Sequence, residues 1–196
     1  MSYEDEYEYK PSILSIIWSW IWSFIVAFII VGGVYFFLGR PFTVSGASMY
    51  PTLHNGDRMV LSKVGDIHRF DVVILKAPDE NVEYIKRVIG MPGDTIEMKS
   101  GVLYINGKKV EQPFINTEAL AKQTVFMDDF TLESLTGESK VPEGKYFVLG
   151  DNRGVSKDSR IIGFIDRSAI EGKAVFTIWP FGRIGGQKNY GYLYSE

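Results

Sequence analysis

The sequence predicts a mainly β protein, with one N-terminal transmembrane helix followed by an antiparallel β ectodomain. Two observations carry this prediction. Residues 12–38 form an apolar run without a charged side chain, and the chain beyond them alternates short β-like runs with turns. The 158 residues from 39 to 196 are enough for one globular core. We therefore expect a tail (1–11), a transmembrane helix (12–38) and one folded domain (39–196).

The apolar run is long enough to cross a bilayer. Its 27 residues would extend about 40 Å as an α-helix, against roughly 30 Å of hydrocarbon in a membrane. A cleaved secretory signal is the alternative, but the preceding tail is acidic, the run is too long, and no A-x-A-like site follows it. The orientation stays open, because Lys10 and Arg40 place one positive charge on each side of the run.

Charge and composition exclude several classes of function. The net charge of −3 resides in the tail, which holds four acidic residues and one lysine, whereas the other 20 basic and 20 acidic residues balance. Without a basic stripe, we expect no nucleic-acid partner. The chain has no cysteine, which removes thiol catalysis, disulfides and thiolate metal sites. With only two histidines, His54 and His68, we expect no multi-histidine metal site.

Turn signals and β-like runs predict the strands of one antiparallel unit. The candidate strands are Arg58–Lys63, Phe70–Leu75, Val82–Ile89, Thr95–Met98, Val102–Ile105, Lys145–Leu149 and Ala174–Trp179. Asn106 and Gly107 form a two-residue hairpin signal, because both tolerate positive φ. Residues 111–141 are more polar and less periodic, so we expect an insertion there, with a short helix over 118–123.

A small-residue turn around Ser48 is the first candidate for chemistry. Ser48 follows the apolar run by ten residues, which can span at most about 33–36 Å, so it would lie near the bilayer surface. Gly46 and Ala47 would let a substrate approach the backbone closely, and Pro51 stiffens the exit of the turn. Taken alone, the segment fits an ordinary loop serine better than a nucleophile.

Lys86 is the candidate general base. In a strand it shares a face with Tyr84 and other apolar residues, so its ammonium lies either in water at a sheet margin or buried. Burial would lower the pKa of the amine from about 10.4, and a neutral amine beside a serine hydroxyl can take its proton. His54 is the competing base for Ser48, although a loop histidine is more often solvated, and His68 is a weaker candidate still.

A third segment, GDNRGVSKDSR (150–160), follows the predicted strand that ends at Leu149. Its turn formers and charges are compatible with a solvated loop. They also supply hydroxyls and carboxylates that could orient a neighbouring lysine. Combined with Ser48 and Lys86, the segment suggests a membrane-tethered hydrolase with a serine nucleophile.

Four segments of the chain, together with the apolar run that precedes them, match a known family in order. They are SGASMYPTL (45–53), RFDVVIL (69–75), YIKRVIGMPGD (84–94) and GDNRGVSKDSR (150–160). The chain resembles type I signal peptidases, membrane-bound serine endopeptidases that remove secretory signal peptides, in the Gram-positive form with one N-terminal span. The resemblance covers the whole chain and implies a signal peptidase-like, Ser-Lys peptidase fold for the ectodomain.

The resemblance implies a catalytic dyad, with Ser48 as the nucleophile and Lys86 as the general base. The backbone N–H of Ser48 would donate a hydrogen bond to the oxyanion. Some relatives add a serine hydroxyl at the position of Gly46, so a side-chain donor is not expected here and the second donor is unassigned. No metal or organic cofactor is implied.

Supporting residues also follow from the resemblance. Ser156 would hydrogen-bond Lys86 and orient it. Two ion pairs, Asp151 with Arg87 and Asp158 with Arg160, would hold the loop beside the dyad.

The implied substrates are the signal peptides of secreted preproteins, cut after small residues in an A-x-A pattern. The resemblance assigns the substrate-binding pockets to Val44, Met49, Leu53, Tyr84 and Ile85. The signal peptide would add as a strand near residues 44 and 84. The implied location is the bacterial cell membrane, with a cytoplasmic tail, an extracytoplasmic catalytic domain, the lipid bilayer as a partner and the secretion translocon nearby.

Two other interpretations share parts of this pattern. A self-cleaving, repressor-type Ser-Lys peptidase would need a DNA-binding domain, where this chain has an apolar span. A catalytically inactive, membrane-anchored β module related to signal peptidases would usually have lost Ser48 or Lys86, and both are present.

Overall fold

The structure is a computed structural model that describes residues 12–38, 41–115 and 128–194. The chain divides into two compact units, Met1–Phe37 and Leu38–Glu196. In the first unit, the described part is a single helix. The second unit contains every strand among the described residues, and the two units are described separately below.

Helix α1 (Ile13–Leu38) agrees with the predicted transmembrane segment to within one residue. Its stretch Ile13–Gly33 has a mean hydropathy of 2.3, so it is long and apolar enough to cross a membrane. Three serine hydroxyls on the helix donate back to backbone carbonyls of the preceding turn, as Ser23 does to Ser19 at 2.9 Å. A polar group satisfied within its own helix is tolerated in hydrocarbon.

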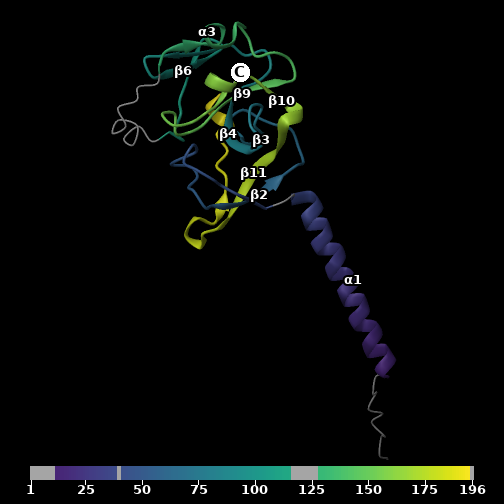
Figure 1. Ribbon diagram of the computed structural model, residues 1–196. Coiled ribbons are helices and arrows are strands. Elements are labelled where there is room, and N and C mark those ends of the chain that lie inside the picture. The colour runs from purple at the N-terminus through teal and green to yellow at the C-terminus, as the bar shows by residue number, and fades with distance from the viewer. Residues whose placement is uncertain (1–11, 39–40, 116–127, 195–196) are drawn as a thin grey trace, which may run out of the picture. The chain divides into compact units, whose positions relative to one another are not determined.

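The larger sheet contains eight strands, all paired antiparallel. They are β1 (Pro41–Thr43), β2 (Arg58–Ser62), β3 (Val72–Lys76), β4 (Glu83–Gly90), β9 (Lys145–Leu149), β10 (Ile165–Asp166), β11 (Ile170–Trp179) and β12 (Gly185–Gly186). Their order is β1-β2-β11-β3-β4-β9-β10, with β12 beside β11 (Figure 1). The predicted mainly β, antiparallel fold is therefore confirmed.

The smaller sheet has the order β7-β6-β5-β8 and lies at the end of the domain marked by β6 and α3 in Figure 1. Its strands are β5 (Ile96–Lys99), β6 (Val102–Ile105), β7 (Lys108–Val110) and β8 (Phe130–Thr131). Asn106 and Gly107 both have positive φ in the β6–β7 turn, as the hairpin signal predicts.

Short helices complete the domain. They are α3 (Leu132–Thr136), α4 (Ser159–Ile162) and the 3-10 turns η1 (Arg167–Ala169), η2 (Phe181–Arg183) and η3 (Gly191–Leu193). From the segment predicted as an insertion, β8 pairs with β5, and Val141 is buried in the core between the sheets. That segment thus contributes one strand to the smaller sheet and part of the core, and the helix expected over 118–123 lies outside the described residues.

Strand boundaries differ from the prediction where the backbone leaves the extended conformation. β3 begins at Val72 instead of Phe70, because Phe70 has a φ of 70°. β11 begins at Ile170, four residues earlier than predicted, and its register against β3 shifts between Ile170 and Gly172. A Cβ at Gly172 would lie 2.8 Å from the Ser62 carbonyl oxygen, so only glycine allows the strands to approach this closely.

Three buried clusters fix the position of β4, the strand that carries Lys86. One cluster packs residues of the smaller sheet against Ile89, Phe147 and Leu149 of the larger sheet. The other two pack on Ile85 and Val88 of β4, respectively. On one side β4 pairs with β3 from Glu83 to Arg87, but on the other side β9 reaches only Arg87, Val88 and Gly90.

Candidate active site

Ser48 and Lys86 meet in the folded domain. The Lys86 Nζ lies 3.1 Å from the Ser48 Oγ, although the two residues are 38 positions apart in the chain. Lys86 comes from the middle of β4 and Ser48 from the turn that follows β1. The Lys86 side chain is almost completely buried, at 3% exposure, which settles its position in favour of burial over the sheet margin.

The turn that carries Ser48, the candidate nucleophile, is built by local hydrogen bonds. Gly46 has a φ of 84°, which glycine adopts without strain, and its N–H donates to the side chain of Asn55 at 2.9 Å. Backbone bonds from Val44 N–H to the Asp57 carbonyl and from Gly56 N–H to the Val44 carbonyl close the loop. These contacts present Ser48 on a braced turn.

Asn152 donates hydrogen bonds to two backbone carbonyls of the same turn. The sequence analysis did not identify it as a candidate site residue. Its backbone N–H donates to the Ser48 carbonyl at 2.9 Å, and its Nδ2 donates to the Ala47 carbonyl at 3.1 Å. The available signal was its place in the segment 150–160, directly after Asp151. The N–H of Ser48 donates to no other described residue, so it remains free for a substrate oxygen.

Burial sets the charge state of Lys86. Loss of hydration lowers the pKa of its amine to about 8, and the negative charge of Asp158 opposes this shift. The Nζ also donates to the Ile85 carbonyl at 3.0 Å, and the ring centroid of Tyr84 lies 4.9 Å away. At pH 7 about a tenth of such an amine is neutral and can accept a proton.

The neighbouring residue Arg87 points to the other face of β4 and is fully paired. Its Nε and Nη2 donate to the two carboxylate oxygens of Asp151 at 2.8 and 2.6 Å, and both side chains are 1% exposed. Its Nη1 donates to the Phe70 carbonyl at 2.8 Å, and the guanidinium stacks on the Phe114 ring at 4.3 Å. The structure therefore brings together the pair that the sequence assigns to Arg87 and Asp151.

The second expected pair is also present. Arg160 donates to both carboxylate oxygens of Asp158, at 2.8 and 2.9 Å. Asp158 further accepts a hydrogen bond from the N–H of Gly150 at 3.0 Å. These contacts fold the segment 150–160 back on itself beneath the dyad.

Ser156 differs from its expected role. Its Oγ is buried but makes no hydrogen bond to any described residue, so the expected bond to Lys86 is not formed. The Lys86 amine instead contacts Ser48 and the Ile85 carbonyl. Ser156 nevertheless lies close to the nucleophile turn, because a Cβ at Gly150 would lie 2.1 Å from the Ser156 Oγ and 2.6 Å from the Ser48 carbonyl oxygen.

The expected substrate-binding residues are mostly core residues. Val44, Met49, Leu53 and Ile85 pack in one buried cluster, each at most 4% exposed. Of the five, only Tyr84 is half-buried, beside the Lys86 amine. The contact of these side chains with substrate stays a prediction.

The two histidines lie outside the dyad. The His54 ring packs edge-on against Tyr50, and Lys86 instead of His54 contacts the Ser48 hydroxyl. His68 is an exposed residue whose ring lies 3.8 Å from the Asp71 carboxylate. The geometry therefore favours lysine over histidine as the partner of the serine.

An antiparallel β domain that sets a serine hydroxyl against a buried lysine amine matches the serine peptidases that use a lysine base. The family model for signal peptidases, peptidase S26, matches residues 17–179 of this chain. The chain belongs to this family and is a serine endopeptidase with signal peptidase function.

Individual relatives agree with this assignment. Signal peptidase I of Bacillus licheniformis is 47% identical over 156 residues, covering 76% of this chain and 81% of the relative. Signal peptidase IB of Staphylococcus aureus is 43% identical over 154 residues, covering 74% and 80%. The crystal structure of a signal peptidase I from Enterococcus faecalis, 40% identical, superposes with a TM-score of 0.51 and covers 57% of this chain and 98% of that one.

Proposed function

We propose that this chain removes signal peptides from secreted preproteins by a Ser48–Lys86 dyad, cutting after small residues in an A-x-A pattern. One observation carries the proposal: the Lys86 amine, with its pKa lowered to about 8 by burial, lies 3.1 Å from the Ser48 hydroxyl. A nucleophile and a base at this distance, with about a tenth of the base neutral at pH 7, are what acyl transfer requires.

The reaction has two steps. Neutral Lys86 accepts the Ser48 proton while the Oγ attacks the scissile carbonyl, and the resulting ammonium protonates the departing amine of the mature protein. Lys86 then accepts a proton from water as the water attacks the acyl-serine, and the resulting ammonium returns a proton to the departing Ser48 Oγ, which frees the signal peptide. The free N–H of Ser48 would stabilise the oxyanion in both steps.

The substrate would add as a strand to an open edge of β4. No described strand pairs with residues 83–86 on the β9 side, and these residues lead directly to Lys86. Backbone N–H and C=O groups at an open edge can pair with an extended peptide. A peptide bound there would place its carbonyl near the Ser48 Oγ, and the close packing of Val44, Met49, Leu53 and Ile85 would leave little space for a large side chain of the substrate.

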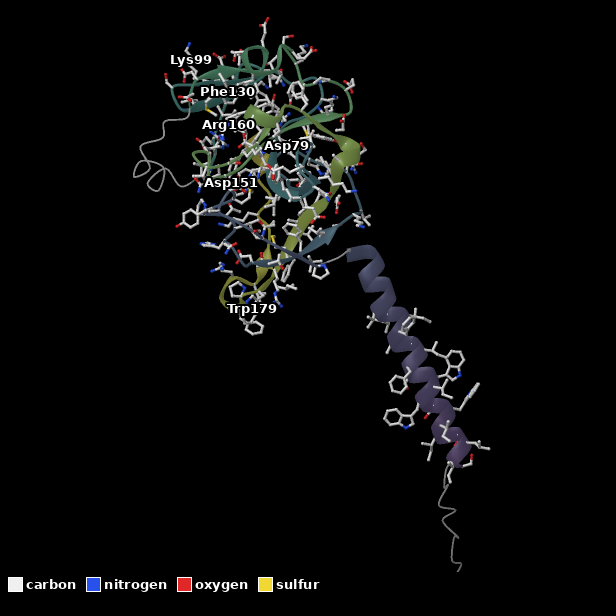
Figure 2. The ribbon with its side chains drawn as sticks, viewed as in Figure 1. Asp79, Lys99, Phe130, Asp151, Arg160 and Trp179 are labelled. Carbon is white, nitrogen blue, oxygen red and sulfur yellow. The ribbon has the colours of Figure 1, made fainter. Side chains whose placement is uncertain are left out.

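The bilayer is the proposed second partner. Trp179 and Phe181 are exposed, at 46% and 73%, and their rings pack against each other at 4.8 Å. In Figure 2, Trp179 marks the end of the domain opposite Lys99 and Phe130. Exposed aromatic side chains of this kind settle in the headgroup region of a membrane. The tether from Leu38 to Ser48 would keep the dyad close to inserted signal peptides.

We further place the catalytic domain on the extracytoplasmic side of the bacterial cell membrane, near the translocon, with residues 1–11 in the cytoplasm. Preproteins present their cleavage sites there after translocation. Protease accessibility of the domain in intact spheroplasts tests this sidedness: digestion only after lysis would contradict it.

The decisive experiment uses the full chain in detergent and a preprotein with an A-x-A site. Cleavage should occur with the wild type and be lost in Ser48→Ala and in Lys86→Ala, while both variants keep the unfolding temperature of a folded protein. Undiminished cleavage by either variant would contradict the dyad. Absence of cleavage by the wild type would favour the inactive β module.

A further inference from the structure

A cluster of three charges joins two loops beside the dyad. The Lys157 Nζ lies 2.5 Å from a carboxylate oxygen of Asp79 and 2.5 Å from one of Glu80. Asp79, labelled in Figure 2, and Glu80 belong to the connection between β3 and β4, whereas Lys157 directly follows Ser156 in the segment 150–160. The proposed mechanism uses none of these three residues.

The cluster is partly exposed, with side-chain exposures of 36–50%. Exposed ion pairs contribute little to the stability of a fold. The contacts nevertheless raise the pKa of Lys157 and lower the pKa of Asp79, so both groups stay charged at the pH of the reaction. One cation shared by two carboxylates fixes the position of one loop relative to the other.

Tyr84 connects this cluster to the catalytic lysine. It lies on the same face of β4 as Lys86, and its ring centroid is 4.9 Å from the Lys86 Nζ. The Lys157 ammonium also interacts with the Tyr84 phenol and opposes the rise in the Tyr84 pKa that desolvation causes. The ring therefore stands between the charged cluster and the amine.

We propose that Lys157 is a positioning residue: with Asp79 and Glu80 it holds the β3–β4 connection against the segment 150–160, so that the Tyr84 ring covers Lys86. This inference rests on the proposed function and adds to it a device that keeps water from the base. Water exclusion matters here because burial is the largest cause of the lowered pKa of Lys86.

Few other charges face the amine. Asp158 acts on Lys86 directly and is itself paired with Arg160. Arg87 and Asp151 lie on the opposite face of β4, and the residue of β3 opposite Lys86 is the buried Val73. A change in the cluster thus reaches Lys86 through hydration or through the charges of the cluster itself, and the two routes can be separated.

The first test is Lys157→Met, with kcat/KM for preprotein cleavage measured from pH 6 to 10. Activity rises with pH as Lys86 loses its proton, so hydration of the amine should move the acid limb upward. We expect an upward shift of about 0.5–1 pH unit and a roughly three- to tenfold loss at pH 7, recovered above the limb. Lys157→Arg should restore the wild-type profile, because it keeps both ion pairs.

The second test separates hydration from charge. In a double variant, Asp79→Asn with Glu80→Gln, removal of two negative charges alone would lower the pKa of Lys86 and move the limb downward. Loss of the contacts should instead admit water and move it upward, as in Lys157→Met. A limb that stays in place or moves downward in the double variant would overturn the proposal.

Lys145→Met is a matched control, because Lys145 is also 40% exposed and paired, with Asp166, at the far end of β9 from the dyad. Its profile should equal that of the wild type, and unfolding temperatures of all variants should agree within a few degrees. The outcomes distinguish the two proposals: an active Ser48→Ala overturns the dyad, whereas an unchanged acid limb in Lys157→Met overturns only the positioning role.

Discussion

Two neighbouring basic residues on β4, Lys86 and Arg87, are both buried but differ in the polar groups around them. The Arg87 guanidinium donates hydrogen bonds to the Asp151 carboxylate and to the Phe70 carbonyl, and it stacks on the Phe114 ring. Lys86 has no carboxylate within hydrogen-bond distance among the described residues, and its polar contacts are one hydroxyl and one carbonyl. Since strand residues alternate in direction, one step along the chain separates these two environments.

The comparison shows that a buried basic residue can stabilise the fold, as Arg87 does, or can have a lowered pKa, as Lys86 does. A buried guanidinium with a bidentate partner ties β4 to the segment 150–160. A buried amine without such a partner gives up its charge more easily, and this is the condition for a base at neutral pH. Three predictions test this contrast and a fourth tests the turn that presents Ser48 to Lys86, in order from the largest expected effect to the smallest.

Lys86→Arg should abolish catalysis although it keeps a long cationic side chain. A guanidinium does not lose its proton in proteins, so Ser48 would have no base and kcat/KM should fall by at least about 10³-fold. Single-turnover cleavage of a preprotein measures the loss. Retention of more than a tenth of the activity would mean that the amine is not the base.

Arg87→Met should unfold the domain more readily, because it leaves the Asp151 carboxylate buried without a partner. Removing one member of a buried ion pair costs about 3–5 kcal/mol, which urea denaturation can measure. The double variant Arg87→Met with Asp151→Leu provides the control. It should cost less than the single change, and an equal or larger cost would show that the pair is not the source of the loss.

Lys86→Met should stabilise the protein while inactivating it. The folded pKa of about 8 lies below the unfolded value of 10.5, so below pH 8 the folded state bears the full cost of holding the charge, up to about 3 kcal/mol. Stability of the wild type should therefore rise with pH between about 8 and 10.5, and the advantage of Lys86→Met should fade over the same window. Unfolding free energies at pH 7 and pH 10 check both signs. An advantage independent of pH would point to packing instead of charge.

Gly150→Ala should reduce kcat with a smaller effect on KM. The added methyl would lie 2.6 Å from the Ser48 carbonyl oxygen and 2.1 Å from the Ser156 Oγ, so the nucleophile turn must shift. A displacement of this kind costs about 10–100-fold in rate. Gly182→Ala is the matched control, because a Cβ at Gly182 meets no atom within 4 Å. Equal losses of kcat in both variants would show that close contact of the added methyl does not explain the effect.

Much of this arrangement could be predicted from the sequence. The apolar run predicted α1, and Asn106-Gly107 predicted the β6–β7 hairpin. For Lys86 the sequence allowed either a position at the sheet margin or burial, and the structure shows that it is buried. The residues alone suggested Ser48 and Lys86 as a nucleophile and its base, and the resemblance strengthened the pairing; their 38-position separation in the chain carries no distance information.

Other features depend on tertiary packing and had no local signal. Strands of two or three residues, such as β1 and β12, are too short for a period-2 pattern and are defined by their neighbours. Asn152 acts through a carbonyl more than a hundred positions away, which no spacing rule detects. The expected bond from Ser156 to Lys86 is not formed, and the amine contacts Ser48 and the Ile85 carbonyl instead.

The open edge of β4 also has a consequence for the behaviour of the protein in solution. Residues 83–86 pair with β3 on one side only, and unpaired strand edges are the usual starting points of edge-to-edge aggregation. Such an edge can in principle also pair with an extended segment of a second copy. The shortness of the edge and the charged cluster at Lys157 limit this hazard. The unpaired edge of β4 is only four residues long, so it offers few backbone groups to a second copy.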